Sequence, residues 1–131
     1  MKLISYLLLV AGALLNSGCV SSNYKLDAAT DKTVYLLEED SVRTAAWGIV
    51  KVTLFKGEYR QVFIGDRGVY LQSSTPMLFQ GVPTRDAYLF IEKGRNGRQA
   101  LWFPDWGNWE WSVKWLDKPI DFRVIPPVMA K

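Results

Sequence analysis

The chain has 131 residues, 49% of them hydrophobic, which is enough for one domain with its own core. Its 16 basic and 13 acidic residues leave a net charge of +3, too small an imbalance to indicate a nucleic-acid partner. Histidine is absent and the single cysteine, Cys19, lies near the N-terminus, so the commonest acid–base group and metal ligands are missing. We therefore expect no metal, no cofactor and no catalytic residues.

The first residues have the pattern of a secretory signal. Lys2 precedes an apolar run from Leu3 to Leu15, and small or polar residues follow that run. A membrane-spanning helix needs about 20 apolar residues, and this run is shorter. The sequence thus predicts a cleaved signal over residues 1–18.

The string LLNSGC, which ends at Cys19, resembles the lipobox of bacterial lipoproteins. Ser17, Gly18 and Cys19 match its last three positions, whereas Asn16 stands where an aliphatic residue is usual. The resemblance covers residues 1–19 only. It implies that the Cys19 thiol carries a diacylglycerol group and that a peptidase cuts before it. The new amine then takes a further acyl chain such as palmitate.

The alternative is an ordinary cleaved signal followed by a chance cysteine. A lone cysteine has no disulfide partner in an oxidising compartment, which favours lipidation, and two or more acyl chains hold a protein firmly at a membrane. In such lipoproteins a residue other than Asp after the cysteine favours the outer membrane. Because Val20 stands there, the resemblance implies an outer-membrane anchor, with the protein facing the periplasm. Residues 19–32 are polar and non-periodic, and we expect them to form the lipidated cysteine and its tether.

From residue 33 onward, short apolar segments alternate with turn residues. We expect strands over residues 34–38, 47–55, 59–64, 69–72 and 77–80, with a loop or a single helical turn over 38–46. In the second of these strands, Val50, Val52 and Leu54 share one face, as in a half-buried strand.

The second half of the chain continues this pattern. Predicted strands over 87–92 and 99–103 flank a tight turn at Asn96-Gly97, and strands over 108–116 and 120–125 follow. About eight or nine short strands without an amphipathic helix predict an all-β domain over 33–126. We expect a small antiparallel meander, either barrel-like or a sandwich, with a C-terminal tail over 127–131.

Most tryptophans lie between residues 101 and 115. In a strand over 108–116, Trp109, Trp111, Val113 and Trp115 would share one face. That face would line the core, form an aromatic platform for a sugar or an apolar partner, or anchor the domain at a membrane interface.

Trp106 lies in a predicted turn, where it would either fold back as a plug or contact a ligand. Nearby Asp105 and Asn108 would supply hydrogen-bonding groups. The candidate ligand-binding residues are therefore Asp105, Trp106, Asn108, Trp109 and Trp111.

Two groups of charged residues complete the candidates. Lys93, Arg95 and Arg98 form a basic hairpin tip, which is either a solvated loop or a contact for phosphate groups of lipid or lipopolysaccharide. Asp105 and Glu110 lie beside the tryptophans, and glycosidases work with two carboxyl groups.

These features together favour a membrane-anchored, non-enzymatic lipoprotein of the cell envelope. Its partners would be the membrane, through lipid on Cys19, and a protein or another envelope component, with no nucleic acid. The alternatives are a glycan- or small-ligand-binding module using residues 102–115 and, less favoured, a glycan hydrolase that uses two carboxylates.

Overall fold

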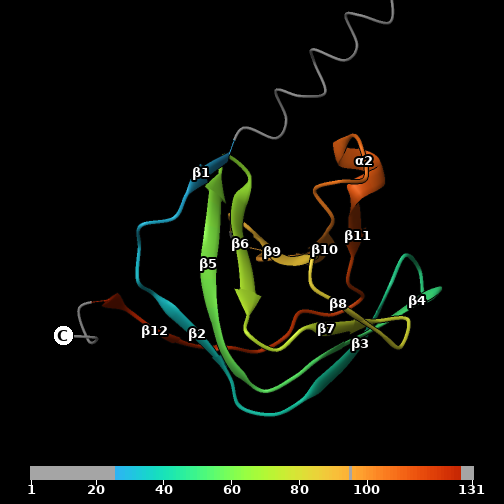
Figure 1. The fold of residues 1–131 in the computed structure, drawn as a ribbon, viewed down its shortest axis with the longest axis horizontal. Coiled ribbons are helices and arrows are strands. Elements are labelled where there is room, and N and C mark those ends of the chain that lie inside the picture. Colours follow the sequence, from blue (N-terminus) through green and yellow to red (C-terminus); the bar gives the residue numbers. More distant parts are fainter. Residues whose placement is uncertain (1–25, 95, 128–131) are drawn as a thin grey trace, which may run out of the picture.

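The computed structural model describes residues 26–94 and 96–127, and these residues form two antiparallel sheets (Figure 1). The expected signal, Cys19 and Arg95 lie outside the described residues, as do residues 128–131 of the expected tail. Within the described part of the chain, no helix is long and apolar enough to span a membrane.

The larger sheet has eight strands in the order β11-β10-β9-β6-β5-β2-β12, with β1 also paired to β5. Its strands are β1 (Leu26–Ala28), β2 (Val34–Leu37), β5 (Gly57–Gly65), β6 (Gly68–Ser73), β9 (Tyr88–Glu92), β10 (Gln99–Trp102), β11 (Val113–Trp115) and β12 (Arg123–Ile125). The strand β5 pairs with β6 along one edge, and its other edge pairs with β2 over the first half and with β1 over the second half. A bulge between Gln61 and Phe63 separates the two halves.

The smaller sheet has four strands in the order β3-β4-β7-β8. They are β3 (Ser41–Ala45), β4 (Val50–Leu54), β7 (Met77–Phe79) and β8 (Val82–Thr84). In Figure 1 these strands lie beside the lower ends of β5 and β6. The only helix among the described residues, α2 (Trp109–Ser112), lies above β11.

The main core lies between the two sheets. Val52 and Leu54 of β4 pack there with Leu71 of β6, Leu89 of β9 and Leu101 of β10, and all five side chains are fully buried. The shared face predicted for Val50, Val52 and Leu54 is therefore confirmed.

A second core lies on the opposite face of the larger sheet. The neighbours of those leucines, Tyr70, Phe90 and Trp102, point to this side because successive side chains of a strand alternate between faces. Trp109 of α2 and Val113 pack over them. The central strands β6, β9 and β10 are thus buried on both faces, which explains why they are apolar almost throughout.

The all-β class and the antiparallel pairing are confirmed, but the finer prediction needs correction. The larger sheet has two free ends, so the domain is not a closed barrel. The strand count was too low, because short strands such as β1, β3 and β8 carry no clear alternation. Residues 26–28, which lie within the tether expected over 19–32, pair with β5 and belong to the sheet.

Three predicted elements are wrong in detail. The expected loop over 38–46 contains β3, which pairs with β4 over its whole length. The strand expected over 47–55 begins only at Val50, because a tight turn precedes it. The strand expected over 108–116 is α2 followed by β11, so Trp109 and Trp111 do not share a strand face.

Candidate functional site

Trp106 packs back onto the core. Its ring stacks on Phe103 with the centroids 4.2 Å apart and 14° between the ring planes, and it meets Phe79 edge-on at 6.1 Å. The ammonium nitrogen of Lys114 lies 5.2 Å from the centroid of the indole. Trp106 therefore covers the edge of the core with part of its ring, while its side chain remains 42% exposed.

Trp109 and Asn108 also have structural roles. Trp109 is buried and meets Phe90 edge-on at 5.4 Å, while the guanidinium of Arg67 lies 4.6 Å from its centroid. The side-chain oxygen of Asn108 accepts a hydrogen bond from the backbone N–H of Trp111 at 3.1 Å and caps α2. Of the five candidates, only Trp111 and Asp105 are exposed without such a role.

The basic tip is partly occupied by internal contacts. Arg98 donates to Glu92 at 2.9 and 3.1 Å, and its guanidinium also lies 4.1 Å from the centroid of Trp115. The hydrogen bond from Arg98 lowers the pKa of the Glu92 carboxyl. Lys93 is exposed, and Arg95 lies outside the described residues. The tip therefore offers less free charge than the sequence suggests.

The most exposed tryptophan is one that sequence reasoning placed inside a strand. The side chain of Trp47 is 98% exposed, and Ile49 beside it is 74% exposed. Both lie in the turn between β3 and β4. This turn, residues 46–49, carries backbone hydrogen bonds from Gly48 N to Ala45 O at 3.1 Å and from Ile49 N to Ala46 O at 3.2 Å.

The backbone of this turn is strained. Ala46 and Trp47 have φ angles of 53° and 57°, in the left-handed region, which costs an L-residue with a Cβ about 1–2 kcal/mol. Glycine would adopt these angles without that cost. A large apolar side chain is thus held in solvent on a strained backbone, and strain of this kind is typical of functional positions.

A hollow of about 540 Å³ lies between this turn and β11, and we call it the Trp47 hollow. Its volume falls in the range of roughly 300–1,000 Å³ that is usual for ligand pockets. It is lined by Ala46, Trp47, Arg98, Glu110, Val113, Lys114, Trp115, Leu116 and Asp117. Indole and aliphatic groups form part of its walls, and both basic and acidic side chains also line it. Glu110 lines this hollow and Asp105 does not, so the two carboxyl groups proposed for hydrolysis do not face one cavity.

Backbone and side-chain contacts hold the two walls of the Trp47 hollow together. The backbone N–H of Ala46 donates to the carbonyl oxygen of Trp115 at 3.3 Å. The hydroxyl of Thr44 donates to the carboxylate of Asp117 at 2.8 Å, and this hydrogen bond lowers the pKa of Asp117. These contacts tie the turn that carries Trp47, and the end of β3 before it, to β11 and the residues that follow it.

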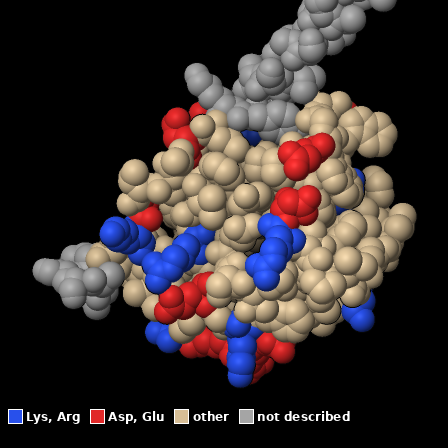
Figure 2. Space-filling model, in the orientation of Figure 1, with Lys and Arg blue, Asp and Glu red and all other residues tan. Residues whose placement is uncertain are grey.

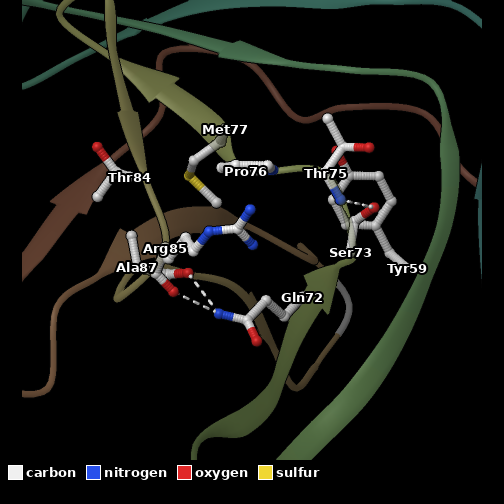
Figure 3. Close-up of a pocket in the computed structure, with 9 residues that line it drawn as sticks. All are labelled: Tyr59, Gln72, Ser73, Thr75, Pro76, Met77, Thr84, Arg85 and Ala87. Carbon is white, nitrogen blue, oxygen red and sulfur yellow. Dashed lines mark hydrogen bonds between the residues drawn. The ribbon is translucent and has the colours of Figure 1, made fainter.

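A second, smaller hollow of about 270 Å³ lies where β6, β7 and β8 meet, and we call it the Arg85 hollow (Figure 3). It is lined by Tyr59, Gln72, Ser73, Thr75, Pro76, Met77, Thr84, Arg85 and Ala87. Sequence reasoning did not find this site, because its residues come from three separate segments of the chain: Tyr59, residues 72–77 and residues 84–87.

The charge pattern of the surface is mixed. On the face shown in Figure 2, basic and acidic side chains are interspersed, with no continuous area of one sign. Residues 26–94 and 96–127 contain no cluster of three or more acidic, His or Cys side chains that could hold a metal ion.

No family model, no curated protein and no solved structure matches this chain. Its function must therefore be inferred from its own residues.

Proposed function

We propose that this protein is a membrane-anchored, non-enzymatic lipoprotein of the cell envelope, and that its β domain binds another envelope protein through the Trp47 hollow. The anchor would be lipid on Cys19, in the outer membrane and with the domain facing the periplasm. The observation that carries the binding site is the exposed, strained position of Trp47 beside this hollow.

Burial of Trp47 by a partner would make a large favourable contribution to the free energy of binding. An aromatic side chain of this kind buries about 150–250 Å² of surface, and tryptophan is among the residues most enriched at binding hot spots. Ile49 lies next to it and Trp115 lines the hollow, so a partner that covers Trp47 also covers further apolar surface. The charges of Lys114 and Glu110 at the same hollow would orient the partner.

A glycan is the second candidate for the same surface. Exposed indole rings stack on sugar rings, and Trp47 and Trp111 are the two most exposed tryptophans among the described residues. Glu110 and Asp117 would accept hydrogen bonds from sugar hydroxyls. Of the tryptophans expected from the sequence to bind a ligand, this alternative keeps only Trp111. The rings of Trp106 and Trp109 pack against other aromatic rings of the fold.

The anchor is tested by labelling cells with radioactive palmitate and comparing the natural chain with Cys19→Ser. We expect label on the natural chain, none on the variant, and release of the variant into the soluble fraction. Labelling of both chains, or of neither, would refute the anchor without bearing on the binding site.

The binding site is tested in intact cells with a photoreactive amino acid placed at Ile49, which lies in the same exposed turn, so that Trp47 itself is kept. We expect one discrete crosslinked product, and none when the same group replaces Val124, which is 53% exposed on β12. Co-sedimentation with purified cell-wall glycan, lost in Trp47→Ala, would instead support the glycan candidate. Crosslinks of equal yield at positions 49 and 124 would show that the hollow has no special role.

A further inference from the structure

Arg85 stands apart from the other described arginines. Each of the others has an acidic, carbonyl or aromatic partner, as seen for Arg43, Arg60, Arg67, Arg98 and Arg123. The guanidinium of Arg85 has no ion pair or hydrogen bond with any residue that the structure describes. In Figure 3 the guanidinium points toward Pro76 and Met77 and lines the Arg85 hollow, while the residue stays exposed to solvent.

The position of Arg85 is fixed through its backbone. The side-chain amide nitrogen of Gln72 donates to the carbonyl oxygen of Arg85 at 2.8 Å and to that of Ala87 at 3.4 Å. These two bonds tie the segment after β8 to β6 (Figure 3). The guanidinium is therefore carried by a segment held against the sheet.

The surroundings of the guanidinium divide into an apolar floor and a polar rim. Met77, Ala87 and Tyr59 are buried and form the floor. The hydroxyl of Tyr59 donates to the backbone oxygen of Phe55 at 2.8 Å, so this residue presents its ring to the hollow and keeps its hydroxyl engaged elsewhere. Ser73, Thr75 and Thr84 complete the lining at the rim.

We propose that the Arg85 hollow binds a small organic carboxylate with a short apolar substituent, such as an N-acylated alanine or the C-terminal residue of a peptide. The planar fork of a guanidinium matches the two oxygens of a carboxylate and holds them with two parallel hydrogen bonds. The short substituent lies on Met77 and Ala87.

The size and charge of the hollow favour this class of ligand over larger or more highly charged anions. Its volume of about 270 Å³ lies just below the range for drug-sized ligands. Arg85 is the only positively charged residue that lines it. One positive charge balances one carboxylate but not a phosphate dianion. The apolar floor would leave part of a phosphate group without hydrogen bonds, which is costly when the group is desolvated.

The test uses the full-length protein in detergent, labelled with ¹³C at the methionine methyl groups. N-acetylalanine is titrated while the signal of Met77 is followed, and the uncharged N-acetylalanine amide serves as the matched probe. We expect a saturable shift with the carboxylate, and binding weaker by about tenfold or more with the amide. A shift that does not saturate, or equal binding of the two probes, would overturn the proposal.

Substitutions of arginine test whether binding requires the guanidinium group of Arg85 or only a positive charge in the protein. Arg85→Gln and Arg85→Lys should each weaken binding by about tenfold, since neither side chain has the fork. Arg60→Gln, which removes an exposed and ion-paired arginine, should leave binding unchanged. An equal loss in Arg60→Gln, or a stronger response to inorganic phosphate than to N-acetylalanine, would overturn the assignment. The result is independent of lipidation at Cys19 and of the Trp47 hollow, because no residue is shared.

Discussion

The backbone N–H of Ala46 donates to the carbonyl oxygen of Trp115 at 3.3 Å, and this bond holds the turn that carries Trp47 against β11. The bond joins the smaller sheet to the edge of the larger one, beside the antiparallel bridge between Ala45 and Leu116. The left-handed backbone of Ala46 is therefore explained by a contact within the fold. That of Trp47 is not, since its side chain contributes almost nothing to the packing.

Trp47→Gly should leave the protein as stable as before or make it more stable. Relief of the left-handed conformation contributes about 1–2 kcal/mol, and the greater freedom of glycine in the unfolded chain offsets about 0.4–1 kcal/mol of this. We expect the free energy of unfolding in urea to rise by about 0–1.6 kcal/mol. Trp47→Ala is the matched control, because it keeps the Cβ and its strain. A clear loss of stability in the glycine variant would mean that Trp47 supports the fold.

Asn108→Ala should destabilise the domain by about 0.5–2 kcal/mol, because it removes the side-chain oxygen that caps α2. Asn108→Asp keeps an acceptor in the same place and should cost much less. Urea unfolding of the three chains gives the comparison. If the alanine and aspartate variants were equally stable, the cap would have no part in holding α2 and Trp109 over the second core.

Stability should fall at high pH because of Tyr59. Burial is the main reason that the pKa of its hydroxyl rises to about 12, against about 10 in an unfolded chain. Between these values the unfolded chain loses the proton while the folded chain keeps it, so the free energy of unfolding decreases as pH rises. Urea unfolding at pH 9 and pH 11 should show this decrease for the natural chain and a smaller one for Tyr59→Phe. The same slope in both chains would exclude Tyr59 as its source.

The sequence predicted those strands whose two-residue alternation matches their burial. Val50, Val52 and Leu54 are the clearest case, because β4 has one face in the core and the other toward solvent. The strand β3 was missed because its sequence, SVRTA, has no such alternation and its pairing with β4 decides its conformation. The helix α2 was missed because WEWS alternates like a strand, and the cap by Asn108 is a weak signal before so short a helix.

The candidate site was harder to predict than the fold. A tryptophan directly before an apolar alternating segment is typical of a strand, and only Gly48 signalled a turn. Ala and Trp rarely adopt positive φ angles, so residue type gave no signal for the left-handed backbone at Ala46 and Trp47. Conversely, Trp106 and Trp109 suggested a binding surface because the sequence could not show that Phe103 and Phe90 pack against them.

The most direct test of the central proposal places the photoreactive amino acid at Lys114, on the opposite wall of the Trp47 hollow, in intact cells. The yield of the crosslinked product is compared between a chain with Trp47 and one with Trp47→Gly, at equal amounts of folded protein in the envelope. The proposal predicts a loss of about tenfold or more in the glycine chain, because a truncated hot-spot residue costs at least about 2 kcal/mol of binding free energy. An unchanged yield would contradict the assignment of Trp47 and its hollow as the binding site.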